Sequence, residues 1–335
     1  MNEKTIEKWT KHGGFRSFLK CATRCGVKIT VLSRESHVIR LGYGGDVAFL
    51  KGANAPVMRR MGNFTRNKDV TKQILEDVGI RTPRGIVANS IQDAITAAKK
   101  HRMPFPLILK PTHGSRSLGV TWNIRSEQDL RDAFSSFEKI KREHSLKKDT
   151  VLVEEMFVGH EYRVLVLNGR VISCVQKIPA SVIGDGTSSI KKLIGAFNRT
   201  RLRGFKIRLD AIAENTIAEN KLTLDSILPK DHVLRLRNNL NMSDGGRSID
   251  VTASMHRSFK DLCVRATEVT GLSFAGVDVI ARDLSKPARR DNYVILELNP
   301  NPYYNMNEKP LAEGKGTDVS FLLLRQLFPN IRKVS

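Results

Sequence analysis

Two apolar runs, GVDVIARD at 276–283 and YVILELNPNPY at 293–303, decide how this chain folds. Successive residues of a strand point to opposite faces, so Glu297 and Asn299 project from the same face. If the strand that carries Asp278 pairs beside them, three oxygen-bearing side chains converge, and such hard ligands suit Mg²⁺ held jointly with a nucleotide phosphate. The alternative is a surface hairpin with solvated acids. It is disfavoured because carboxylates inside runs this apolar are costly unless they are paired or bound to a metal.

The bulk composition indicates a globular protein without a membrane span. The chain has 335 residues, 37.6 kDa and 40% hydrophobic residues, which is enough for two or three small domains. No apolar run is long enough to cross a bilayer, and the N-terminus lacks the apolar core of a secretory signal. Cys21, Cys25, Cys174 and Cys263 lack zinc-site spacing and are expected to be buried thiols. These features predict a reducing, cytoplasmic location.

The net charge is the unusual bulk property. A charge of +22 and a pI of about 10.1 predict an anionic partner: nucleic acid, an acidic peptide or a phosphorylated metabolite. The basic residues are spread along the whole chain, and aromatic residues make up only 6%, unlike single-strand nucleic-acid binders. Nucleic acid is therefore the less favoured of these partners.

The first sixty residues are predicted to form a small α/β unit. RSFLKCATRCG at 16–26 has helical spacing and ends at a glycine, and two apolar stretches follow as a strand and as a strand–glycine turn–strand. Near Met58 the sequence becomes basic and polar. We therefore expect a lead-in domain at 1–62 and a main domain at 63–335.

Two lysines lie where a phosphate group would satisfy them. Lys68 begins the helix pattern NKDVTKQILEDVGI, where the helix dipole disfavours a cation, so it is either a solvated surface lysine or a phosphate ligand. Lys110 ends the apolar strand PLILK, and a small-residue loop with Gly114, Ser115 and Gly119 follows. Such a loop can cradle phosphate with its N–H groups, although the pattern is not a Walker A motif.

The stretch 150–186 is predicted to form three strands, with NGR as a hairpin turn. Glu154 and Glu155 end the first strand and Glu161 begins the second, where free backbone groups can read an adenine edge and a carboxylate can hold a ribose. Arg163 and Lys177 lie on consecutive strands and can face one cavity. Salt-bridged surface charges are the alternative for each of these residues.

One further arginine, Arg247, follows the glycine pair Gly245–Gly246. We expect a mobile loop there that brings Arg247 to an anionic transition state.

Taken together, these motifs resemble the ATP-grasp carboxylate–amine ligases, and most closely the ATP-grasp part of cyanophycin synthetases and bifunctional glutathione synthetases. The similarity covers roughly 40–314, and the ordered set is more specific than any single motif. The motifs are RLGYG from Arg40, NKDVTKQILEDVGI from Asn67, LKPTHGSRSLGV from Leu109, VEEMFVGHEYRVLVLNGRV from Val153, KIPASVIGDG from Lys177, RNNLNMSDGGRSIDVT from Arg237, AGVDVIARDLSKPAR from Ala275 and ELNPNPYYNMNEKPLAEG from Glu297.

The resemblance implies an α+β fold in which two α+β subdomains clamp ATP, with a central lid subdomain at about 104–160 and a C-terminal subdomain at about 161–335. Lys68 and Lys110 would contact the α- and β-phosphates. The backbone from Glu154 to Phe157 would read adenine, and Glu161 would bind ribose. The remaining implied roles are two Mg²⁺ ions, replaceable by Mn²⁺, on Asp278, Glu297 and Asn299, and stabilisation of the transferred phosphate and the substrate carboxylate by Arg163, Lys177 and Arg247.

The function implied is an ADP-forming ligase that activates an amino-acid or peptide carboxylate as an acyl phosphate and joins it to an amine. The surplus of cations favours an acidic substrate. Unlike cyanophycin synthetase, the chain shows no second, Mur-ligase-like module after the grasp motifs, so a two-amino-acid polymer is not the expected product. Two alternatives are a nucleic-acid-binding protein that keeps the fold without ligase activity, and a ligase that modifies a protein. The oligomeric state, including a homo-oligomer, is left open.

Overall fold

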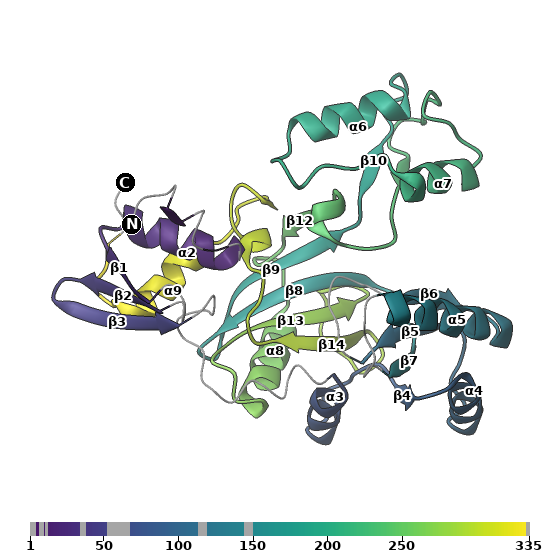
Figure 1. Cartoon of the computed structure of the whole chain (residues 1–335), viewed down its shortest axis with the longest axis horizontal. Coiled ribbons are helices and arrows are strands. Elements are labelled where there is room, and N and C mark those ends of the chain that lie inside the picture. Colours follow the sequence, from purple (N-terminus) through teal and green to yellow (C-terminus); the bar gives the residue numbers. More distant parts are fainter. Residues whose placement is uncertain are drawn as a thin grey trace.

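A six-stranded sheet forms the centre of the molecule (Figure 1). The structure is a computed structural model, and it describes residues 5–6, 10, 13–33, 38–51, 68–112, 119–143 and 150–332. The sheet is antiparallel except for its last pair, β12 and β15. Its spatial order is β14 (Tyr293–Asn299), β13 (Phe274–Ala281), β8 (His160–Leu167), β9 (Arg170–Ile178), β12 (Arg247–Asp250) and β15 (Ala312–Glu313).

Helix α8 (Arg257–Val269) covers one face of this sheet. Phe259 and Cys263 on the helix are fully buried in one core with Val164 of β8 and Val277 of β13. These sheet residues alternate with Arg163 and Asp278, so the apolar side of each strand faces α8 and the charged side faces away. The charged residues occupy only part of this second face, because Leu165, Leu167 and Phe274 on the same face are buried in a separate core.

A second, four-stranded antiparallel sheet carries the lysine strand. Its order is β4 (Gly85–Ala88), β7 (Val151–Glu155), β5 (Leu107–Pro111) and β6 (Thr121–Ile124), and its helices are α4 (Ile91–Lys100) and α5 (Glu127–Glu143). The core of this unit includes Leu107, Leu109, Phe137 and Val153. Helix α3 (Lys68–Asp77) precedes it and buries Leu75 in the core beneath α8, so α3 bridges the two sheets.

The N-terminal unit shares its core with the end of the chain. It consists of α2 (Gly13–Arg24) and the sheet β1 (Lys28–Ser33), β2 (Val38–Tyr43) and β3 (Asp46–Lys51), and α9 (Val319–Leu327) lies against α2 (Figure 1). Phe18, Leu323 and Phe274 are buried together. All four cysteines are free and buried, as predicted. The predicted domain boundary at residues 62–63 lies outside the described residues and stays a prediction.

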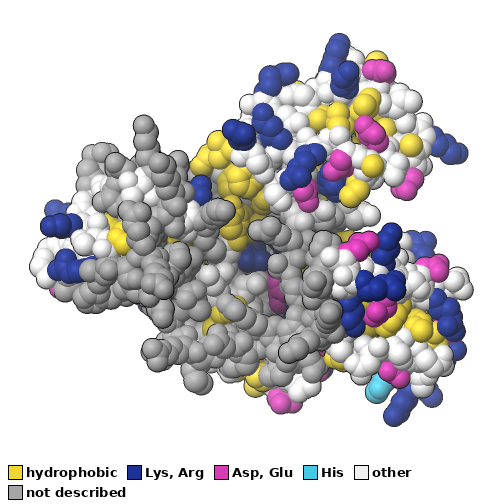
Figure 2. All heavy atoms as spheres, viewed as in Figure 1, with side chains coloured by type: hydrophobic (Ala, Val, Ile, Leu, Met, Phe, Trp, Pro, Cys, Tyr) yellow, Lys and Arg dark blue, Asp and Glu magenta, His cyan; other side chains and the backbone are white. Residues whose placement is uncertain are grey.

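A small lobe is inserted between β9 and β12. It contains β10 (Ser181–Ile183), α6 (Ile190–Arg199), α7 (Ala211–Glu219) and β11 (Val233–Arg235), and the short helices η2 (Met242–Asp244) and η3 (Asn305–Asn307) lie near its base. Ile190, Ile194, Ile217 and Leu234 form a core of its own. In the space-filling view this lobe and the lobe of the four-stranded sheet stand apart, with a recess between them (Figure 2). Among the helices that the structure describes, none is long and apolar enough to cross a bilayer.

Candidate active site

The structure brings together the three side chains expected to bind a metal. Asp278 on β13 lies opposite Glu297 on β14, and Gly276 lies opposite Asn299. The amide nitrogen of Asn299 donates to Asp278 Oδ2 and to Glu297 Oε1, at 3.0 Å in both cases. The three groups therefore form one cluster on the polar face of the sheet, as the alternation predicts.

Two cations from the neighbouring strands balance Asp278. Arg163 on β8 forms a bidentate pair with it, with Nε 2.6 Å from Oδ1 and Nη2 2.8 Å from Oδ2. Lys177 on β9 is 3.8 Å from Oδ1 and also pairs with Glu161. Burial of Asp278 would raise its pKa, but Arg163 and then Lys177 outweigh this and hold it at about 2. The carboxylate is thus ionised at neutral pH, and its bidentate pair with Arg163 fixes its orientation.

The donor set of this cluster fits a divalent cation. It offers the hard oxygen ligands of two carboxylates and an amide, which suit Mg²⁺. In the structure the amide N–H group of Asn299 lies between the two carboxylates, in the place that a cation would take. Nowhere in the described ranges do three or more Asp, Glu, His or Cys side chains gather into a metal site, so Asn299 and ligand oxygens would complete the coordination.

A second charged cluster lies on the four-stranded sheet. Glu154 on β7 is only 1% exposed and pairs with two lysines: Lys110 of β5, with Nζ 2.5 Å from Oε2, and Lys72 of α3 at the other oxygen. Burial and the nearby Lys68 lower the pKa of Lys110 to about 8. Two ammonium groups therefore share the Glu154 carboxylate, and a third cation, Lys68, acts on Lys110.

Lys72 was missing from the sequence-based prediction. It lies one helical turn after Lys68 on α3, so the two lysines share a helix face. This spacing is the signal that could have identified it. The prediction placed Glu154 near adenine. In the structure its carboxylate pairs with Lys72 and Lys110 and holds these two side chains in place.

The two clusters lie close enough to interact. Lys110, on the four-stranded sheet, is influenced by Glu297 and Glu161 of the six-stranded sheet, both of which favour its charged form. Cations from one sheet and acids from the other therefore face the same space. This arrangement is what a polyphosphate with its metal ions requires, since the phosphates need cations and the metal needs acids.

The segment that connects β7 of the four-stranded sheet to β8 of the six-stranded sheet is held in place by arginine side chains. Glu155 accepts hydrogen bonds from the Arg84 backbone N and Nε, both at 3.1 Å, and the guanidinium of Arg81 lies 5.3 Å from the centre of the Phe157 ring. The Glu155 and Met156 N–H groups donate to Arg84 O and Pro106 O, so these two are not free to read a base. For the other backbone groups from Glu154 to Phe157, contact with adenine stays a prediction.

The expectation of a mobile loop at Arg247 is wrong. Arg247 begins β12 and forms a bidentate pair with Glu313, with Nε 2.8 Å from Oε1. The next residue, Ser248, lies opposite Lys177 and donates to Met306 O at 2.7 Å, which fixes the strand. Since neighbouring strand residues point to opposite faces, Arg247 is directed away from the face of Lys177. The structure therefore does not bring Arg247 into the cluster of Arg163 and Lys177.

The small-residue loop after β5 is described only at its end. Gly114 and Ser115 lie outside the described residues. Gly119 has a φ of +70° and passes close to Pro111 and Phe137, where a side chain would be strained. Its predicted role in phosphate binding stays a prediction.

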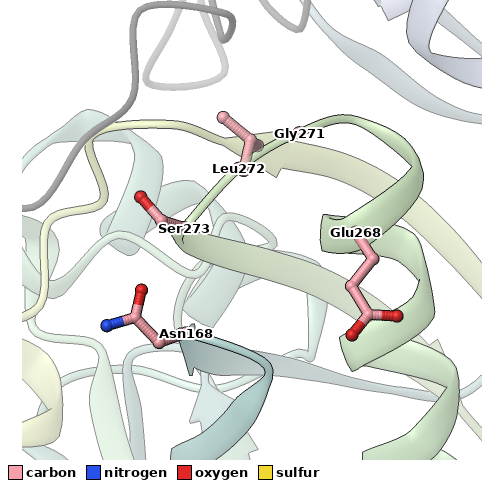
Figure 3. Close-up of a pocket in the computed structure, with 5 residues that line it drawn as sticks. All are labelled: Asn168, Glu268, Gly271, Leu272 and Ser273. Atoms are coloured by element: carbon pink, nitrogen blue, oxygen red, sulfur yellow. The ribbon is translucent and has the colours of Figure 1, made fainter.

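One open pocket lies away from these clusters. It has a volume of about 530 Å³ and is lined by Asn168, Glu268, Gly271, Leu272 and Ser273 (Figure 3). Asn168 follows the end of β8, whereas Glu161 and Arg163 lie at its beginning. The pocket is therefore separate from the facing clusters.

Comparison with known proteins identifies the family. The model of the ATP-grasp domain matches residues 58–172. Cyanophycin synthetase of Synechocystis sp. is 34% identical over 301 residues, which are 88% of this chain and 34% of that protein. The glutathione biosynthesis bifunctional protein of Mannheimia succiniciproducens is 32% identical over 330 residues, 92% of this chain and 42% of that protein.

The fold agrees with these matches. The crystal structure of a bifunctional glutathione synthetase from Pasteurella multocida superposes with a TM-score of 0.72 and 29% identity, over 94% of this chain and 44% of that one. The chain therefore belongs to the ATP-grasp family and has the predicted α+β ATP-grasp fold. It spans between 34% and 42% of the length of the two curated relatives above.

Proposed function

We propose that this protein is an ADP-forming carboxylate–amine ligase that uses ATP and Mg²⁺. The observation that carries the proposal is the pair of charged clusters: Asp278, Glu297 and Asn299 joined by hydrogen bonds on one sheet, and Lys110 and Lys72 paired with Glu154 on the other. The relatives support a bond-forming reaction, since both kinds are synthetases by name.

Each cluster has a role in holding the nucleotide. Lys68 and Lys110 would contact the α- and β-phosphates, with the loop at Gly114, Ser115 and Gly119 around them. Glu161 would hold the ribose. Asp278, Glu297 and Asn299 would hold two Mg²⁺ ions, or Mn²⁺ in their place, and these ions would neutralise the charge of the β- and γ-phosphates.

The reaction follows from this charge distribution. A carboxylate oxygen of the substrate attacks the γ-phosphorus, and the bond between this phosphorus and the β-phosphate oxygen breaks. The products of this step are ADP and an acyl phosphate. An amine then attacks the acyl carbon, loses a proton and displaces inorganic phosphate to form an amide. The buried Arg163 and the nearby Lys177 would stabilise the transferred phosphate group, so the protein works by positioning and electrostatics.

The charge of the chain supports an acidic substrate. The net charge of +22 exceeds what a single nucleotide would balance. We therefore expect at least one substrate to be an acidic amino acid or a peptide that contains one.

The proposal is tested by phosphate release from ATP and Mg²⁺ in the presence of pooled amino acids and short acidic peptides, followed by intact-mass analysis. Release that depends on one pool, with a product lighter by one water than its parts, is the expected result. Glu297→Gln is the matched inactive control. Binding of ATP without release in any pool would point to a macromolecular acceptor, whereas no binding of ATP would contradict the proposal.

A further inference from the structure

A third charged cluster lies where the inserted lobe meets the edge of the six-stranded sheet. Arg201, just after α6, lies 3.4 Å from Glu313 Oε1 through Nη1 and donates from Nη2 to Gly246 O at 3.1 Å. Arg247 pairs with the same carboxylate, with Nη2 2.5 Å from Oε2. Two guanidinium groups from different elements thus share one carboxylate.

Arg201 is the less satisfied member of this cluster. Its side chain is only 9% exposed, and its buried Nε has no hydrogen-bond partner within the part of the chain that the structure describes. Its guanidinium also lies 5.2 Å from the centre of the Phe197 ring. A buried donor without an acceptor is costly, so the cluster is short of acceptor groups.

Glu313 is the residue of this cluster that another carboxylate can displace from the two arginines. Its side chain is 31% exposed, and it comes from β15, which has only two residues. Burial lowers the pKa of Arg201; the charge of Glu313 opposes this shift without reversing it, and the charge of Arg247 adds to the lowering. A second carboxylate would relieve this imbalance, because guanidinium groups bind carboxylates in a bidentate manner.

The position of the cluster separates it from phosphate transfer. Arg247 is next to Ser248, the strand partner of Lys177, but alternation directs Arg247 to the other face. The chain passes from β9 directly into the lobe that carries Arg201. The cluster is therefore close to the proposed catalytic lysine along the sheet edge and distinct from it in orientation.

We propose that Arg201 and Arg247 form a recognition site for a second, non-reacting carboxylate of the substrate, and that Glu313 is the internal carboxylate that this group displaces. The inference rests on the proposed ligase function and narrows its substrate to an acidic amino acid or a peptide that carries one. Arg201 is a specificity-determining residue here, and it takes no part in the chemical step.

Calorimetric binding with two acid–amide pairs, glutamate with glutamine and aspartate with asparagine, tests the site without turnover. The wild type is expected to bind at least one acid tenfold or more tightly than its amide. Arg201→Met should remove this preference, while Arg199→Met, on the exposed end of α6, removes the same charge and should leave it intact. Glu313→Gln should strengthen binding of the acid several-fold, because the competing carboxylate is gone.

The opposite results would overturn the site. A wild type that binds none of the acids in preference to its amide contradicts it, as does weaker binding of the acid in Glu313→Gln, which is what a purely structural ion pair predicts. In the ligase assay Arg201→Met should raise KM for the acidic substrate at least tenfold and leave kcat within about twofold. Turnover with an unchanged acid preference in Arg201→Met would reject the site and keep the ligase. Acid binding without turnover would keep the site and reject the ligase.

Discussion

The two charged clusters that face each other are built in opposite ways. Around Asp278, three carboxylates (Asp278, Glu297 and Glu161) lie with two cations, and the buried Asp278 is held by Arg163 and Lys177. Around Glu154, two lysines share one carboxylate, a third lysine, Lys68, acts on Lys110, and the pKa of Lys110 is lowered to about 8. The first cluster is thus arranged around a fixed acid, and the second is short of negative charge.

This difference indicates which kind of ligand each cluster is suited to bind. An acid-rich cluster of hard oxygen ligands suits a divalent cation, and a lysine cluster in which burial lowers the pKa of Lys110 suits a phosphate, which favours the charged form of that lysine. A nucleotide with its metal ions carries both groups. The asymmetry between the clusters therefore orients the nucleotide, with its phosphates between the two sheets.

The largest effect is expected at the acid-rich cluster. Asp278→Asn should lower turnover by about 10³-fold or more, since it removes a proposed metal ligand, and should lower the free energy of unfolding by about 3–5 kcal/mol, since it leaves Arg163 buried without its partner. Turnover assays and urea unfolding measure the two effects. Asp283→Asn, an exposed change just after β13, is the control, and equal behaviour of the two variants would contradict the assignment.

Glu297→Gln separates catalysis from stability. Glu297 is half-buried, and within the described cluster it accepts a hydrogen bond from Asn299 and none from an arginine. The free energy of unfolding should therefore change by less than about 1 kcal/mol. Turnover should nevertheless fall by about 10²-fold or more, because a metal ligand is lost. Mg²⁺-dependent turnover that equals the wild-type rate would show that the cluster holds no metal.

The two lysines on Glu154 should respond differently. Lys110→Met should raise KM for ATP by about 10- to 100-fold, the value of one charge-assisted hydrogen bond of about 1.5–3 kcal/mol. Lys72→Met should instead mainly lower the unfolding free energy, because Lys72 also donates to Pro83 O at 3.2 Å and ties α3 to the following turn. An equal loss of ATP affinity in both variants would assign both lysines to the phosphates.

The smallest expected effect is a pH dependence of ATP binding. The pKa of Lys110 is lowered from 10.5 to about 8, so the lysine is charged below pH 8 and loses its charge above it. ATP affinity should therefore fall by about tenfold between pH 7 and pH 9.5 in the wild type. Lys110→Arg stays charged over this range and should show a flat profile; a parallel fall in this variant would place the titrating group elsewhere.

The acid-rich cluster could be predicted from sequence because it depends on local rules. Alternation along two apolar strands places Asp278, Glu297 and Asn299 on one face, and the hairpin turn at Asn168–Gly169, with φ of 46° and 71°, fixes β8 beside β9. The helices α4, α5 and α8 also follow directly from apolar spacing.

The remaining features depend on contacts between distant segments. The pairing of Lys72 on α3 with Glu154 on β7 joins residues that are 82 positions apart in the sequence. The Arg247–Glu313 pair joins residues 66 positions apart, and it converts an expected loop into a strand within the sheet. Glycine content indicated flexibility at Arg247, but strand pairing with β9 and β15 determined the structure there.

The central claim is that both clusters act on one nucleotide, and calorimetric titration of ATP with and without Mg²⁺ tests it most directly. In the wild type Mg²⁺ should strengthen ATP binding. Lys110→Met should weaken binding by a similar factor in both conditions, whereas Glu297→Gln should keep the affinity without Mg²⁺ and lose the gain that Mg²⁺ brings. An undiminished effect of Mg²⁺ in Glu297→Gln, or wild-type affinity in Lys110→Met, would contradict the account.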